Sequence, residues 1–313
     1  MQKIFAVTSS PHLRDDISTR RIMQEVCLAL APAGVAGIIL YGSSAAMLIA
    51  AAVITAVVAE WAWQKLNKQP STVGDWSAVV TGLLLAYTLP ASAPVWMAVV
   101  GSLLAVVLVK QVFGGIGSNF MNPALTARAI LFVSWGGIMG TYPATRFMAD
   151  TMSSATPLAV LAKQGIDGVS FWNLLIGNCG GVLGETCKLA LILGGAYLIW
   201  RNLIDWKIPA AFIGTVFVCY LFKDGFGTAV YQVLAGGLLL GAFFMATDYV
   251  TSPVTNVGRI IMGVGCGLIL FVIRAYASYP EGCSFAILFM NVCTPLIDKF
   301  TVPKAFGEVK NRG

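Results

Sequence analysis

The chain has 313 residues, of which 58% are apolar and only 11% are charged, and its formal net charge is +6. A soluble globular domain carries about 25% charged residues, so this composition excludes an ordinary soluble protein. Long runs of about twenty apolar residues match the thickness of the hydrocarbon core of a bilayer. The sequence therefore predicts an all-α integral membrane protein.

Charge and cysteine patterns exclude further classes. The 20 basic residues are spread between apolar runs and form no patch with interleaved aromatic residues, so no nucleic-acid partner is predicted. The seven cysteines contain no C-x-x-C pair, which disfavours a metal or iron–sulfur site built from this chain alone. The sequence has no P-loop, dinucleotide fingerprint or Ser/His/Asp set, so we assign no catalytic residue.

The apolar runs predict ten membrane spans, the first of them retained instead of being cleaved as a signal. Several are short or interrupted by glycine and proline, which is typical of half-helices that other parts of the protein cover. The spans cover residues 22–40, 45–63, 76–89, 95–112, 124–138, 181–200, 208–222, 230–247, 259–275 and 284–297.

The basic residues predict the orientation of these spans. With a cytoplasmic N-terminus, fourteen lysines and arginines face the cytoplasm and four face the other side, while Arg128 and Lys188 fall within spans. This distribution follows the positive-inside rule. We therefore expect a multi-pass protein of the inner (cytoplasmic) membrane with both termini in the cytoplasm. The longest connection, residues 139–180, then lies outside.

Three matches between the two halves occur in the same order and indicate an internal repeat. Glu25-Val-Cys-Leu-Ala-Leu30 resembles Glu185-Thr-Cys-Lys-Leu-Ala-Leu191, and two further pairs follow near Gly82/Gly237 and Gly117/Gly282. Each repeat holds five spans, so the copies are inverted, and inverted repeats place ligands where they meet. The chain divides into a cytoplasmic segment 1–21, a first repeat 22–138, an external loop 139–180, a second repeat 181–297 and a tail 298–313.

The external loop contains one unusually polar stretch, DTMSSATPL, at residues 150–158. Pro157 suits the first position of a helix and Thr156 suits the N-cap before it. LAVLAK then supplies a short helix up to Lys163. The simplest interpretation is a capped helix in an external loop.

Several stretches along nearly the whole chain resemble the RnfD/NqrB family, membrane subunits of the Rnf complex and of the sodium-translocating NADH:quinone oxidoreductase. The matching stretches are SSPHLRDDIST, FMNPALTARAILF, GGVLGETCKLALILGG, MATDYVTSPVTNVGRIIMG and YPEGCSFAILFMN with PLID. Their number and separation make the resemblance highly specific.

The resemblance implies a covalent flavin on Thr156. In that family, FMN is joined by a phosphoester to the last threonine of a D-x-x-[ST]-G-A-T pattern. Asp150, Ser153, Ala155 and Thr156 match this pattern. Ser154 stands where glycine is usual, and serine is less free to adopt a positive φ angle. A helix N-terminus at Thr156 would also favour the phosphate electrostatically, and Arg146 and Lys163 lie in the same loop.

The resemblance further implies a subunit, inactive alone, of an electron-transfer chain between ferredoxin and NAD that moves Na⁺ or H⁺. Its expected partners are the other Rnf subunits, which handle NAD and ferredoxin, and a flavin transferase. A second, noncovalent riboflavin near the repeat interface is a further expectation. The alternative is a solute channel or secondary transporter, because inverted repeats also serve transport without redox chemistry.

Acidic residues in or near the spans are candidates for an ion path. Glu25 and Glu185 are related by the repeat, and Asp248 lies between the eighth and ninth spans. The structural alternatives are that Glu185 neutralises Lys188 one turn later, and that Asp248 pairs with Arg259.

Arg128 and His12 also have two interpretations each. Arg128 either contacts the flavin or extends its side chain to the cytoplasmic boundary, and the second interpretation is slightly favoured. His12, the only histidine, is interpreted as a surface contact with a partner instead of a proton relay.

Overall fold

The computed structural model describes residues 18–147, 155–277 and 281–303. Within these ranges the fold is helical, and the only β pairing is an isolated antiparallel bridge between Pro90 and Val182. The predicted residues His12, Asp150, Ser153 and Ser154 lie outside the described residues.

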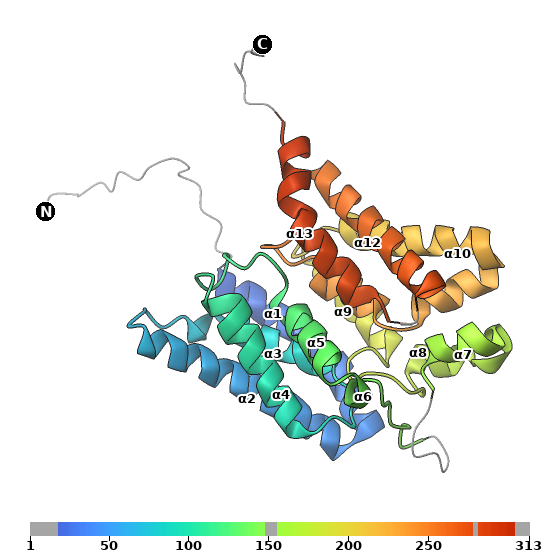
Figure 1. The fold of residues 1–313 in the computed structure, drawn as a ribbon, viewed down its shortest axis with the longest axis horizontal. Helices are drawn as coiled ribbons and strands as arrows, with labels where there is room; N and C mark the ends of the chain where they lie inside the picture. Colours follow the sequence, from blue (N-terminus) through green and yellow to red (C-terminus); the bar gives the residue numbers. More distant parts are fainter. Residues whose placement is uncertain (1–17, 148–154, 278–280, 304–313) are drawn as a thin grey trace, which may run out of the picture.

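The N-terminal half contains five helices that pack together (Figure 1). A π-helical segment, η2, continues α4, and a four-residue helix, α6, follows α5. The elements are α1 (Thr19–Tyr41), α2 (Ser43–Leu66), η1 (Val73–Asp75), α3 (Ser77–Tyr87), α4 (Val95–Leu103), η2 (Leu104–Gln111), α5 (Pro123–Ser134) and α6 (Gly136–Met139).

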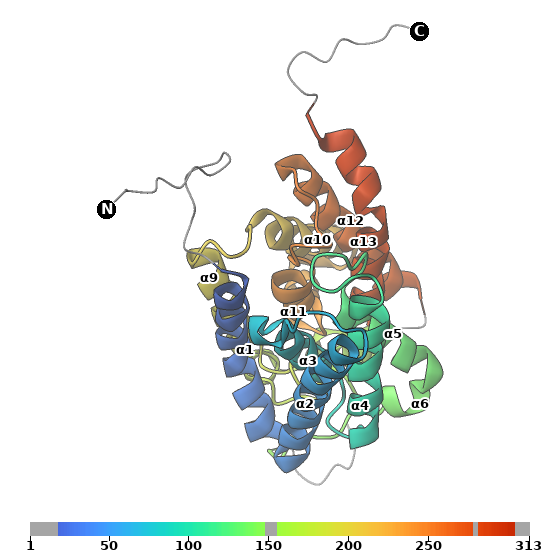
Figure 2. The ribbon, with the colours of Figure 1, turned by 90° about the vertical axis from the view of Figure 1, so that its left-hand side faces the viewer.

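The C-terminal half begins with three short elements and continues into longer helices, of which α10, α12 and α13 lie together beyond the first half (Figures 1 and 2). The elements are α7 (Pro157–Gln164), η3 (Ile166–Gly168), α8 (Phe171–Ile176), α9 (Lys188–Trp200), α10 (Lys207–Leu234), α11 (Leu238–Leu240), η4 (Gly241–Met245), α12 (Asn256–Tyr276) and α13 (Cys283–Thr301).

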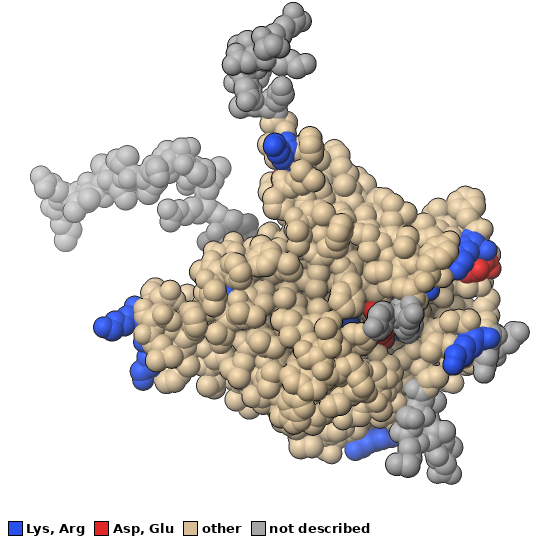
Figure 3. All heavy atoms as spheres, viewed as in Figure 1, with Lys and Arg blue, Asp and Glu red and all other residues tan. Residues whose placement is uncertain are grey.

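The lengths and apolar composition of these helices make this a multi-pass membrane protein. Five of the described helices, α1, α2, α10, α12 and α13, are long and apolar enough to cross a bilayer. The other apolar helices, such as α3 and α5, are shorter, with 10–17 residues. On the face shown in Figure 3, charged side chains lie mainly near the margins of a large uncharged surface.

The structure corrects one of the predicted spans. The span predicted at 181–200 becomes helical only at Lys188, because residues 177–187 form an irregular segment. Between the predicted spans 208–222 and 230–247, α10 is interrupted at Gly225, where a non-helical backbone (φ +87°, ψ 174°) separates two helices. Glycine adopts this positive φ without strain, so the two helices meet at Gly225 as separate elements.

Two irregular segments from different halves pair with each other. At the end of α3, the carbonyl oxygens of Leu89 and Tyr87 accept hydrogen bonds from the N–H groups of Leu183 (3.0 Å) and Gly184 (2.9 Å), respectively. The Tyr41 hydroxyl also donates to the carbonyl of Gly181 at 3.3 Å. These bonds satisfy backbone groups that have no helical partner, as the interior of a membrane protein requires.

Gly184 allows this close approach, and we expect Gly184→Ala to destabilise the fold. A Cβ at position 184 would lie 2.1 Å from the Cβ of Tyr87, which cannot swing away as the end of a flexible side chain can. Overpacking of this kind costs about 1–3 kcal/mol or more. Thermal unfolding of the purified protein should show a lower midpoint for this variant. Gly74→Ala, where nothing lies within 4 Å, is the control, and equal midpoints for both variants would contradict the assignment.

Candidate functional site

Thr156 caps α7, as the Thr-Pro pair predicts. Its backbone is extended (φ −65°, ψ 150°), and its Oγ accepts a hydrogen bond from the N–H of Ala159 at 3.3 Å. Pro157 occupies the first turn, where its missing N–H costs nothing. The Thr156 side chain is therefore held at the positive end of an eight-residue helix.

A small cavity of about 10 Å³ adjoins Thr156 on its buried side. Three charged side chains line this cavity, one from the start of α9 and two from segments outside the helices. The lining residues include Thr156, Cys179, Glu185, Lys188, Gly236 and Glu281. The space holds about one water molecule and is too small for a flavin ring or a phosphate group, but it brings Thr156 and Lys188 to one pocket.

Lys188 begins α9 and is buried, with 2% of its surface exposed. Its Nζ donates to the backbone carbonyls of Glu185 and Gly236, the latter at 2.8 Å. Among the described residues, no close ion pair joins it to the Glu185 carboxylate, although the two charges attract each other, so their mutual neutralisation stays a prediction. The spacing argument assumed a continuous helix, whereas Glu185 precedes the helix in an irregular segment.

Arg128 on α5 is buried and paired, not extended to the cytoplasmic boundary. Its Nη2 lies 2.5 Å from the Oε2 of Glu281, and its Nη1 donates to the Ser284 hydroxyl at 3.0 Å. The guanidinium thereby joins the N-terminal half to the start of α13. Sequence reasoning missed Glu281 as a site residue, although YPEGCSF was among the stretches that carry the family resemblance.

Glu25 occupies very different surroundings from Glu185. On α1, Glu25 accepts hydrogen bonds from Tyr197 and from Arg201, whose Nη2 lies 2.9 Å from Oε1. Its side chain is 17% exposed, whereas Glu185 is buried in the core beside Lys188. The repeat-related positions are thus not brought into matching environments.

A larger cavity, of about 380 Å³, lies between the two halves. Most of its surface is apolar, and Lys110, Asn119 and Asp248 supply polar groups. α1, α3, the segment before α5, the end of α9 and η4 contribute to its wall. Cavities of this size and character commonly hold small molecules or cofactors.

Asp248 lines this cavity and does not pair with Arg259. It accepts a hydrogen bond from the Thr251 hydroxyl at 3.2 Å, while Arg259 binds Asp205 at 2.6 Å, so the predicted pairing is wrong. Burial alone would raise the pKa of Asp205, but hydrogen bonds from the Lys207 N–H and from Arg259 outweigh it and lower that pKa. Asp205 lies in the connection before α10, which sequence reasoning did not consider.

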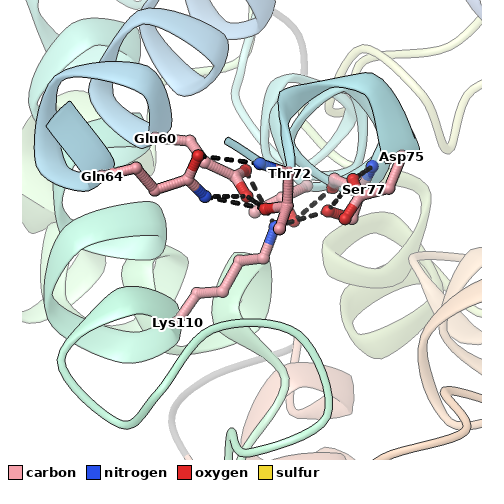
Figure 4. Close-up of polar contacts among 7 residues, drawn as sticks. Glu60, Gln64, Thr72, Asp75, Ser77 and Lys110 are labelled. Atoms are coloured by element: carbon pink, nitrogen blue, oxygen red, sulfur yellow. Dashed lines mark hydrogen bonds and ion pairs between the residues drawn. The ribbon is translucent and has the colours of Figure 1, made fainter. Parts of the chain in front are cut away.

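A buried ion pair at one wall of the cavity was also missed from the sequence. The Lys110 Nζ lies 2.9 Å from the Oε2 of Glu60 and donates to the Ser77 hydroxyl at 2.6 Å (Figure 4). Gln64 and Thr72 donate to the other oxygen of Glu60, at 3.2 and 3.0 Å. In the sequence, only Glu60 hints at this pair, because it lies within an otherwise apolar run. Lys110 gives no such hint, since it resembles a residue at the cytoplasmic boundary.

The fold and these sites define a class: a multi-pass helical membrane protein with irregular segments and buried charges where its halves meet. The chain belongs to the NQR2, RnfD, RnfE family, whose model matches residues 6–307.

Relatives agree with this assignment over nearly their whole length. The chain is 52% identical over 309 residues to the D subunit of the Na⁺-translocating ferredoxin:NAD⁺ oxidoreductase complex of Acetobacterium woodii, covering 97% of this chain and 96% of the relative. It is 42% identical to the D subunit of the proton-translocating ferredoxin:NAD⁺ oxidoreductase complex of Clostridium ljungdahlii (98% and 97% covered). It is 34% identical to the D subunit of an ion-translocating oxidoreductase complex of Escherichia coli (98% and 99% covered).

Removing one partner of the buried Glu60–Lys110 ion pair should destabilise the protein strongly. Lys110→Met leaves the Glu60 carboxylate buried without its cation, which costs about 3–5 kcal/mol. We expect a large drop in the thermal midpoint and partial recovery in the Glu60→Met/Lys110→Met double variant. Lys65→Met, which removes an exposed lysine from the same helix as Glu60, is the matched control. A single variant as stable as this control would show that the pair does not hold the fold.

Proposed function

We propose that this chain is the membrane subunit of a redox-driven ion pump and carries FMN in phosphoester linkage to Thr156. In this role it takes part in electron transfer between ferredoxin and NAD, coupled to translocation of Na⁺ or H⁺. Membership of the family and the names of the relatives support the complex. The main observation that supports this attachment site is the position of Thr156 at the N-terminus of α7.

The surroundings of Thr156 suit the phosphate of such a link. A phosphodiester retains one negative charge, which the free N–H groups and positive dipole end of α7 stabilise. Lys188 lines the same small cavity and adds a buried cation. The flavin ring supplies the electron-carrying chemistry when bound. The cavity is too small for the ring, which must therefore lie outside it.

We further propose ten spanning segments in two inverted five-helix repeats, in the inner membrane and with both termini in the cytoplasm. A related contact in each half supports this arrangement. Lys110, at the end of η2, donates to Ser77 at the start of α3, and Arg274, near the end of α12, donates to the carbonyl of Ala235 just before α11. Lys110 and Arg274 are 164 positions apart, within the 155–165 spacing of the sequence repeat.

The proposed partners are the other subunits of the complex and the flavin transferase. The sequence shows no nucleotide-binding fingerprint, so ferredoxin and NAD are assigned to other subunits. One relative is named for Na⁺ and another for protons, so the names leave the transported ion of this chain open. Within this chain, Glu25, Glu185 and Asp248 are the candidate ion-path residues, because carboxylates in membrane segments serve ion routes.

The cavity between the halves supports a second, noncovalent flavin. Its volume of about 380 Å³ lies within the range of cofactor pockets. Its apolar wall would contact a flavin ring, and Lys110, Asn119 and Asp248 would meet polar atoms of riboflavin. A solute channel or transporter remains the rival function, and it predicts no flavin of either kind.

Loss of the Thr156 hydroxyl should abolish covalent flavin. On a denaturing gel under ultraviolet light, the wild-type band should fluoresce and the Thr156→Ala band should not, because the oxygen that forms the ester is gone. Thr141→Ala, an exposed threonine of the same connection, should keep its fluorescence. A fluorescent Thr156→Ala band would place the flavin on another residue, and a dark wild-type band would favour the transporter.

Filling the larger cavity should remove the noncovalent flavin alone. Val26 lines the cavity from α1, so Val26→Trp should reduce acid-extractable riboflavin severalfold while leaving the covalent FMN in the precipitated protein. Val35→Trp, at a 56% exposed position of the same helix, is the matched control. Equal extractable flavin in the two variants, or none in the wild type, would contradict this site.

A further inference from the structure

The larger cavity between the two halves has few charged groups in its wall. Among the described residues that line it, Lys110 and Asp248 are the only charged ones. Most of the remaining wall is apolar, so a charged ligand would lose its hydration there and need compensation from the protein. The charge that Lys110 and Asp248 leave uncompensated therefore decides which ligands the cavity can accept.

The charge of Lys110 is already compensated by Glu60. The Lys110 Nζ lies 2.9 Å from the Oε2 of Glu60, which is fully buried and does not line the cavity (Figure 4). The Ser77 hydroxyl takes a second N–H of the ammonium group, at 2.6 Å. An ammonium group has three N–H donors, so one of them remains for a ligand. Lys110 can thus donate to an uncharged acceptor, but its pairing with Glu60 leaves it little charge for a phosphate.

Two helices that begin at the cavity wall have N-terminal N–H groups that are already capped. At the start of α5, the side chain of Asn122 accepts hydrogen bonds from the N–H groups of Ala124 (3.1 Å) and Leu125 (3.2 Å). At the start of α3, the Asp75 carboxylate accepts one from the N–H of Ser77 at 2.8 Å. A phosphate that binds at a helix N-terminus needs such N–H groups to be free. These groups are therefore not available to hold an anion in the cavity.

Asp248 supplies a negative charge that no described cation compensates. It lies shortly after η4 and accepts a hydrogen bond from the Thr251 hydroxyl at 3.2 Å. Among the described residues, no lysine or arginine forms an ion pair with it. Because Lys110 and Glu60 cancel, the described wall and the groups that support it keep one negative charge.

We propose that Asp248 is a specificity-determining residue of this cavity, which admits riboflavin and rejects its phosphorylated forms. This inference rests on the proposed second, noncovalent flavin. The phosphate of FMN carries about two negative charges at pH 7. In the cavity it would meet the charge of Asp248 and find no unpaired cation among the described lining residues. The uncharged hydroxyl groups of riboflavin can instead accept a hydrogen bond from Lys110 and donate one to Asp248.

The test measures the flavins that acid extracts from the full chain, purified alone in detergent so that other subunits contribute none. In the wild type, riboflavin should exceed FMN by about tenfold or more, because the wall repels the phosphate. Asp248→Asn removes the negative charge at nearly constant size and should raise the FMN share severalfold. Asp224→Asn, which removes an exposed carboxylate of α10 outside the cavity, is the matched control and should keep the wild-type ratio.

Two further measurements locate the effect and cover a variant that fails to fold. Val26→Trp fills the cavity from α1, so Val26→Trp/Asp248→Asn should lose the FMN that Asp248→Asn gains, and FMN retained there would overturn the inference. In the wild-type chain, unlabelled riboflavin should displace radiolabelled riboflavin at a concentration about tenfold lower than FMN requires. Equal concentrations would also overturn it.

The extracted flavins separate this inference from the proposed function on which it rests. A wild-type chain that holds riboflavin and FMN equally, or an Asp248→Asn ratio equal to that of the wild type, refutes the selectivity and leaves the second flavin site intact. A wild-type chain that contains covalent FMN but no extractable flavin refutes the second flavin, and the selectivity with it.

Discussion

The pairing of two irregular segments at the centre of the molecule determines where its functional groups lie. The carbonyl oxygens of Tyr87 and Leu89 accept hydrogen bonds from the N–H groups of Gly184 and Leu183. Backbone groups outside the helices thus have hydrogen-bond partners where no water is available. This pairing allows α3 to end at Tyr87 and α9 to begin only at Lys188. Without it, residue 185 would lie on a helix, and its carboxyl group would not face the start of α13.

Two buried lysines and the partly buried Arg274 donate hydrogen bonds to these interrupted helices. Lys188 and Arg274 donate to the carbonyl oxygens of Gly236 and Ala235, just before α11, while Lys110 donates to Ser77 at the start of α3. Each cation gains hydrogen bonds that offset part of its desolvation. The short helices are thereby fixed at one end, and charge is concentrated where the two halves meet. A cofactor attached at Thr156 would lie next to one of these centres, and the larger cavity lies next to another.

The sequence was sufficient for features that depend on local patterns. Hydropathy predicted α1 and α2 within a few residues, and the Thr-Pro pair predicted the cap of α7 at Thr156 because capping needs only neighbouring residues. The N-terminal half-helices also appeared as short apolar runs, such as α3.

Features that depend on contacts between distant segments were not predictable in the same way. The spacing of Glu185 and Lys188 suggested a helical ion pair, but tertiary pairing with Leu89 keeps that segment irregular. Arg128 looked like a boundary residue because its partner, Glu281, is 153 positions away. Glu60 and Lys110 were missed for the same reason, since no local pattern links residues 50 positions apart.

The most direct test of the covalent attachment is the intact mass of the chain isolated from its native membrane. A phosphoester on Thr156 predicts a mass greater than that of the amino acids by one FMN less one water, with the added mass on the peptide that contains Thr156. A functioning chain whose mass equals that of its amino acids alone would contradict it.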